Sequence, residues 1–255
     1  MGFFSGRVIR QTKFKFEFLS LNVFDVLPYR SGVFLYFFYA ILANMVITYF
    51  GKSYFKITLG DLTIALNPPA KESKAFAKPP RFGSDLVLIS TNHPDYNGVE
   101  TVSLGDKKPF VVDGAGSYEI GGSFFNGESN RIFFDGKERI NTLYGFEVDG
   151  IKICFMGLIT DKASLSSEAK EIAALADMIF VPIGGGELFD PATAYKVATS
   201  FDVNVIIPYE YDDQSLQKFL KEGGQEKVEI LDKYTVKRRD LDGKEGVIIA
   251  LAPQA

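Results

Sequence analysis

The sequence is poor in the two residue types that most often build metal and redox sites. It contains one histidine, His93, and one cysteine, Cys154, among 255 residues, and it has no tryptophan. A single histidine excludes every site that needs several imidazole ligands, and a single cysteine excludes an intrachain disulfide framework. Cys154 lies within the apolar run of residues 151–156. This setting is typical of a buried, inert thiol, because a nucleophilic thiolate would need a base beside it.

An excess of basic charge is also missing. The chain has 28 Lys and Arg against 32 Asp and Glu, which gives a net charge of -4 and an isoelectric point near 5.2. This balance provides no basic footprint for nucleic acid, so we expect no nucleic-acid partner. The contents of hydrophobic residues, 46%, and of charged residues, 24%, are ordinary for a globular protein. The single cysteine fits a reducing compartment, and we expect a cytoplasmic location.

The first 44 residues differ in texture from the rest of the chain. They are rich in Phe, and their charges, which are mostly basic, all lie before residue 31. Residues 33–50 form an uncharged run that extends past residue 44. That run is barely long enough to cross a bilayer. Residues 45–50 are β-branched and aromatic and are followed by Gly51, which is typical of a first strand. We therefore predict a domain over residues 45–255, preceded by an extension that is dispensable or mis-assigned, a packed helix, or a membrane anchor formed by residues 33–50.

From residue 45 the hydrophobic pattern becomes regular. Short segments separated by Gly and Asp-Gly turns predict strands in the first half, and strand and helix patterns alternate in the second half. Asp190 followed by Pro191 marks a helix start, because Asp is a preferred cap and Pro a preferred first residue. This mixture predicts sheets covered by helices. We expect strands at 45–50, 53–59, 62–66, 85–90, 109–112, 118–120, 142–148, 151–156, 178–183, 203–208, 228–231, 235–238 and 246–251, and helices at 166–176, 191–200 and 214–221.

The most informative segment is a predicted buried strand, residues 85–90, that runs into the polar loop of residues 91–97. The loop reads Thr-Asn-His-Pro-Asp-Tyr-Asn. It resembles the His-x-His-x-Asp-His metal-binding signature of the metallo-β-lactamase superfamily. Residues 47–57, 114–122 and 182–191 are similar, in the same order, to segments of the branch that includes ascorbate-phosphate-lactonase-like hydrolases. The resemblance implies an α/β (α+β) fold over residues 45–255: an αβ/βα sandwich of two mixed sheets flanked by helices, with a metal site at one edge.

The metal ligands of that family are largely replaced in this chain. In the resemblance, Thr91 and Tyr96 stand where the loop motif has histidines, and Leu158 stands where a bridging aspartate is expected. His93 and Asp95 keep their places in the motif, and Glu210 takes the place of a late histidine. These three residues could hold at most one divalent metal, either Zn, Fe or Mn. The alternative is that no metal binds, that His93 is a hydrogen-bonded loop histidine, and that Asp95 caps a helix starting near Asn97.

A cleft is expected where the family has its metal site. Tyrosines can bind a ligand through their hydroxyl groups, or they can fill a vacated site. The glycines of residues 184–186 either form a tight turn that lets the backbone pass close to the site or expose N–H groups to an anion. Such a cleft could accept a small-molecule ligand. The residues expected to line it are Thr91, Tyr96, Leu158, Tyr209, Gly184 and Gly185.

The function that the resemblance implies is metal-dependent hydrolysis of an ester, lactone or phosphoester. In that chemistry a metal-bound hydroxide attacks and the metals stabilise the developing oxyanion. Because most ligands are replaced, we expect a degenerate member with weak or lost activity. The alternative, from another functional class, is a non-catalytic binding or scaffold protein that uses the vacated cleft.

Overall fold

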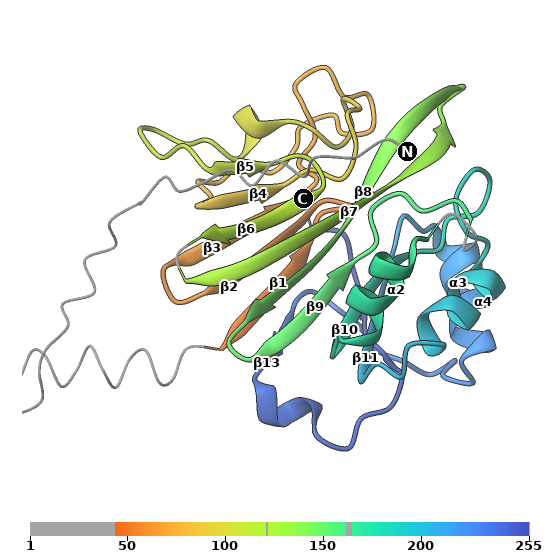
Figure 1. The fold of residues 1–255 in the computed structure, drawn as a ribbon. Coiled ribbons are helices and arrows are strands. Elements are labelled where there is room, and N and C mark those ends of the chain that lie inside the picture. The colour runs from red at the N-terminus through yellow and green to blue at the C-terminus, as the bar shows by residue number, and fades with distance from the viewer. Residues whose placement is uncertain (1–43, 121, 162–164, 255) are drawn as a thin grey trace, which may run out of the picture.

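The computed structural model describes residues 44–120, 122–161 and 165–254 (Figure 1). It contains two large mixed sheets that face each other, with three helices on one side. The expected sandwich of two mixed sheets flanked by helices is confirmed. The predicted extension lies outside the described residues except for Asn44, so its role stays a prediction.

The first sheet holds the loop that resembles the metal-binding signature. Its strands follow the order β13-β1-β2-β3-β4-β5. The pairs β13–β1, β1–β2 and β2–β3 are antiparallel, whereas β3, β4 and β5 are parallel. The strands are β1 (Met45–Tyr49), β2 (Phe55–Leu59), β3 (Leu62–Leu66), β4 (Leu86–Leu88), β5 (Phe110–Val112) and β13 (Tyr234–Val236).

Strand β1 settles how the apolar run over residues 33–50 is divided. Met45, Ile47 and Tyr49 are buried between the sheets, and β1 is hydrogen-bonded on both sides, to β2 and β13. The prediction of a first strand here is confirmed, so Met45–Tyr49 would not be available to an anchor. Across the part of the chain that the structure describes, no helix has the length and apolar character needed to span a membrane.

The second sheet has the order β14-β11-β10-β9-β8-β7-β6. Its long hairpin β7–β8 projects beyond the neighbouring strands (Figure 1). The sequence prediction was wrong for this hairpin. It placed one strand at residues 142–148, whereas β8 already begins at Lys137, and it missed β7. The strands are β6 (Gly116–Ile120), β7 (Ser123–Phe134), β8 (Lys137–Val148), β9 (Ile151–Phe155), β10 (Met178–Pro182), β11 (Val205–Tyr209) and β14 (Val247–Ile248).

Three helices cover the outer face of the second sheet: α2 (Ser167–Ala174), α3 (Pro191–Thr199) and α4 (Asp213–Glu222) (Figure 1). All three were predicted, and each begins with a side-chain cap, from Ser166, Asp190 and Asp212 respectively. These caps satisfy backbone N–H groups that have no partner within the helix.

The outer face of the first sheet is covered differently. The chain between β3 and β5 packs on it through Phe76, Phe82 and Val102 and includes the 3-10 helix η1 (Val99–Thr101). The closing strands were predicted too long. Of residues 228–231 only β12 (Ile230–Leu231) is a strand, and residues 246–251 divide into β14 and β15 (Ala250–Leu251), which pairs in parallel with β12. The 3-10 helix η3 (Arg238–Leu241) lies between β13 and β14.

Candidate functional site

The loop after β4 is tied to both sheets, by the buried amide of Asn67 and by the hydroxyl of Thr91. Asn67, which follows β3, accepts a hydrogen bond from the backbone N–H of Ser90 at 2.7 Å and donates to the Ser90 hydroxyl at 2.7 Å. Thr91 donates its hydroxyl hydrogen bond to the carbonyl of Ile140 in β8. The Thr91 side chain is thus engaged by the hairpin at the first histidine position of the resemblance.

His93 is a hydrogen-bonded loop histidine. Its Nδ1 accepts the backbone N–H of Asp95 at 3.1 Å, so the proton of the neutral ring lies on Nε2. Nε2 is 3.4 Å from the carboxylate of Asp135 at the tip of the β7–β8 hairpin. The N–H of Asp135 in turn donates to Glu187 at 2.8 Å. The single histidine therefore joins the loop to the hairpin tip.

Asp95 lies beside His93 but does not cap a helix. Its Oδ2 is 3.8 Å from Nδ1 of His93, and its Oδ1 accepts a hydrogen bond from the Ser73 hydroxyl at 2.6 Å. The next element, η1, has Gly98 as its N-cap and no side-chain cap. The prediction that Asp95 caps a helix near Asn97 was wrong, because the hydroxyl of Ser73, on the long loop after β3, takes up the carboxylate instead.

Glu210 is the most strongly perturbed acid of the site. It follows β11 with a left-handed backbone, φ 56°, and its side chain is only 4% exposed. Burial raises the pKa of its carboxyl from 4.5 to about 7, although Lys52 and Tyr96 lower it, and the Asp95 charge raises it further. Its Oε2 is 3.6 Å from Nζ of Lys52, whereas its Oε1 has no hydrogen-bond partner among the described residues. Burial is the largest of these causes, and the Asp95 charge is the smallest.

Three residues expected to line a cleft are core residues instead. Tyr96 and Leu158 are buried together with Ile132 in a small apolar cluster, and Leu158 is 0% exposed. Tyr209 is buried between the two sheets and donates its hydroxyl hydrogen bond to the carbonyl of Gly157. Their side chains occupy the space in which the resemblance places ligands, and this is why they do not line an open cleft.

The glycine turn passes close to Glu210. A Cβ atom added to Gly184 would lie 2.1 Å from the carbonyl oxygen of Glu210, so only glycine fits there. Gly185 has a φ of 70° and donates its N–H to Phe189 at 2.9 Å. The tight-turn interpretation of residues 184–186 is confirmed.

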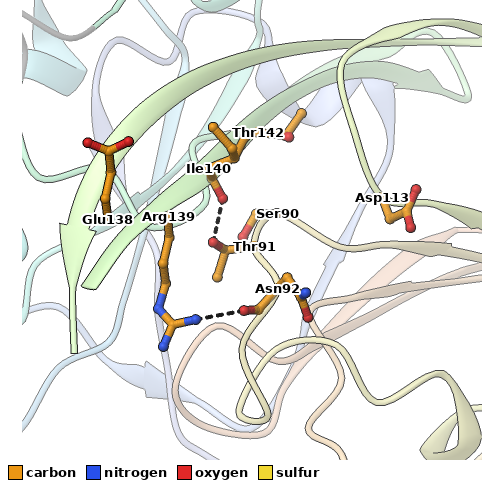
Figure 2. A pocket seen from close by; sticks show the side chains of 8 residues that line it. All are labelled: Ser90, Thr91, Asn92, Asp113, Glu138, Arg139, Ile140 and Thr142. Carbon is orange, nitrogen blue, oxygen red and sulfur yellow. Dashed lines mark hydrogen bonds between the residues drawn. The ribbon is translucent and has the colours of Figure 1, made fainter. Parts of the chain in front are cut away.

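A cavity of about 260 Å³ lies between the loop and the hairpin (Figure 2). Thr91 is the one residue of the predicted cleft that lines it. Figure 2 shows Glu138 and Asp113 on opposite sides and Arg139 turned to the carbonyl of Asn92, which accepts a hydrogen bond from the guanidinium at 2.8 Å. The lining residues are Ser90, Thr91, Asn92, Asp113, Glu138, Arg139, Ile140 and Thr142.

Comparison with known proteins shows the family. The model of the beta-lactamase superfamily domain matches residues 46–210. This chain belongs to the beta-lactamase superfamily. The match runs from β1 to Glu210, so it contains the loop, the hairpin and all the candidate site residues. No curated protein matches the chain.

Three solved structures share the fold over most of their length. A candidate zinc-dependent hydrolase of the metallo-β-lactamase superfamily from Thermotoga maritima has 25% identity and a TM-score of 0.63, and the alignment covers 81% of this chain and 98% of that one. For a candidate metal-dependent hydrolase from Parabacteroides distasonis the identity is 15%, the TM-score 0.56, and the coverage 84% and 94%. For a metallo hydrolase from the archaeon Ignicoccus hospitalis the values are 20%, 0.50, 76% and 97%.

The residues of this superfamily member do not fit a two-metal centre. Where ligands are expected, Thr91 is bonded to the hairpin, and Tyr96 and Leu158 are packed in an apolar cluster. Over the described ranges, no group of three or more His, Cys, Asp and Glu side chains is placed to hold a metal ion. His93 and Asp95 lie together, whereas Glu210 faces Lys52.

Lys52 is the site residue that sequence reasoning missed. It lies in the turn between β1 and β2, far from the loop motif in sequence. A lone lysine after Gly51 has no distinctive pattern, because such turns are usually solvated. Only the approach of β11 to this turn gives it a buried partner.

Proposed function

We propose that this superfamily member is a degenerate hydrolase whose metal-dependent activity toward esters, lactones or phosphoesters is weak or lost. The observation that carries the proposal is the packing of Leu158, which is 0% exposed, against Tyr96. An apolar side chain at the bridging position supplies no ligand, and it excludes the water that a metal would activate.

The surroundings of the remaining acids support the same proposal. Glu210 is balanced by the ammonium group of Lys52, and Asp95 is hydrogen-bonded to Ser73. A metal at His93, Asp95 and Glu210 would have to displace or outcompete these partners. We therefore propose that this set holds at most one metal ion.

A second candidate function is the binding of a small molecule without catalysis. The cavity beside Thr91 favours it, because its volume of about 260 Å³ suits a small polar compound. Two carboxylates line the cavity, Glu138 and Asp113. Glu138 is paired with Arg131, and Arg139 bonds the backbone of the loop, whereas Asp113 forms no ion pair with any described residue.

Metal analysis combined with hydrolysis assays tests the first proposal. The protein is expressed in zinc-supplemented medium, its metal content is measured by elemental analysis, and its turnover of model esters, lactones and phosphoesters is recorded. We expect fewer than two tightly held metals and turnover near the uncatalysed rate. Two zinc ions per chain together with efficient turnover would refute the degenerate-hydrolase proposal.

The binding function needs a separate test. A library of small polar compounds is screened by thermal shift and protein-observed NMR against the native protein, against Asp113→Asn and against the control Asp106→Asn, whose exposed carboxylate lies outside the lining. Binding that weakens in Asp113→Asn and persists in Asp106→Asn supports the cavity as the site. Equal weakening in both variants argues against it.

A further inference from the structure

Lys52 and Glu210 meet across the two sheets. Lys52 lies in the turn between β1 and β2 of the first sheet, and Glu210 follows β11 of the second sheet. Both have a left-handed backbone, with φ of 54° and 56°. Residues other than glycine rarely adopt this conformation unless their surroundings impose it, and such residues often mark functional positions.

The backbones of the two residues are locked together by hydrogen bonds. The N–H of Glu210 is 3.1 Å from the carbonyl oxygen of Lys52 and 3.2 Å from the Tyr49 hydroxyl. That hydroxyl in turn donates to the Lys52 carbonyl at 2.8 Å. These bonds hold the two backbones side by side and bring the two side chains within reach of each other.

The charges of the pair are arranged as an internal ion pair. A buried carboxylate is costly unless a cation or several hydrogen bonds balance it. Among the described residues, Lys52 is the only cation within 4.0 Å of the Glu210 carboxylate, at 3.6 Å. The Lys52 side chain is 46% exposed and that of Glu210 only 4%, so the pair joins a partly solvated cation to a buried acid.

We propose that the ammonium group of Lys52 performs the two tasks of a metal ion at this edge of the sandwich. It neutralises the Glu210 carboxylate, and its ion pair with Glu210 stabilises the contact between the two sheets. The geometry supports this because the partners come from opposite sheets, and because the residues nearby do not form a metal-holding group. The inference does not depend on what the protein binds or hydrolyses.

A double-mutant cycle on the full chain tests the proposal. Thermal unfolding is measured at about pH 8 in buffer with EDTA for the native protein, Lys52→Met, Glu210→Gln and the double variant. Lys52→Met should lower the Tm by about 3–6 °C when Glu210 is present. In the Glu210→Gln background the same change should leave the Tm nearly unaffected, because no buried charge then needs a partner.

Two further variants separate charge from packing. Lys52→Arg keeps the cation and should retain most of the native Tm. Lys218→Met, at an exposed position of α4 with no ion pair to any described residue, should change the Tm little. An equal loss on Lys52→Met in both backgrounds would overturn the proposal. So would a native protein whose Tm falls on EDTA treatment, because its stability would then rest on a metal. The cycle can fail while the hydrolysis assays still show an inactive protein, so the two proposals are distinguishable.

Discussion

Replacing Glu210 by glutamine should make the protein less sensitive to pH. Because burial raises the pKa of Glu210 from 4.5 to about 7, the folded state holds this proton more tightly than the unfolded chain does. The stability contributed by the neutral carboxyl is fully present below about pH 4.5. It is lost as the pH rises toward 7, since the folded state must then accommodate a buried charge.

The size of the effect follows from the two pKa values. A rise from 4.5 to about 7 is a difference of about 2.5 pH units, and each pH unit corresponds to about 1.4 kcal/mol. The native protein should therefore lose about 3 kcal/mol of unfolding free energy between about pH 4.5 and 8 through this group. Glutamine has nearly the same volume and no charge, so Glu210→Gln should lack this loss.

Urea unfolding at about pH 5 and pH 8 measures the difference, with circular dichroism as the signal because the chain has no tryptophan. The gain of Glu210→Gln over the native protein should be larger by about 2–3 kcal/mol at the higher pH. Glu147→Gln, at an exposed position of β8, is the control and should show no such change. If Glu210→Gln differs from the native protein by the same amount at both pH values, the carboxylate does not titrate as a buried group and the reasoning fails.

Other changes should act through packing and backbone. Leu158→Asp restores a carboxylate at the bridging position but buries it among apolar side chains, so we expect a loss of more than about 3 kcal/mol of unfolding free energy by urea titration; near-native stability would contradict the packed site. Gly184→Ala should lower the unfolding free energy by more than about 2 kcal/mol, because its Cβ would clash with the Glu210 carbonyl. Gly114→Ala is the control: its Cβ would meet open space, so the loss should be less than about 1 kcal/mol. A chain starting at Met45 should match the full chain in Tm, since β1 already begins there; aggregation of the short chain would show that the extension is needed.

The sequence predicted the elements that have strong local signals. Asp190 followed by Pro191 led to a correct helix, and the short segments between glycine turns led to the correct strands β1 to β3, because these signals are local. Strand β7 was missed because the run from Asn126 to Asn130 is polar and interrupts the apolar alternation. Only its pairing with β8 holds that segment in a strand.

The site was predictable in its location but not in its contacts. The loop motif located His93, Asp95 and Thr91 correctly after β4. It could not reveal that Ser73 takes up Asp95 or that Lys52 pairs with Glu210, because these partners come from turns that are distant in sequence. Such contacts depend on how the two sheets stack, which no local pattern encodes.

The contact between His93 and the hairpin tip allows movement of the hairpin to be followed through a single side chain. Because His93 is the only histidine, imidazole resonances in an NMR spectrum come from one ring alone. That ring touches Asp135 of the hairpin tip and the backbone of its own loop, beside the cavity next to Thr91. Any ligand that lifts or clamps the hairpin would thus be visible as a change in a single, unambiguously assigned signal.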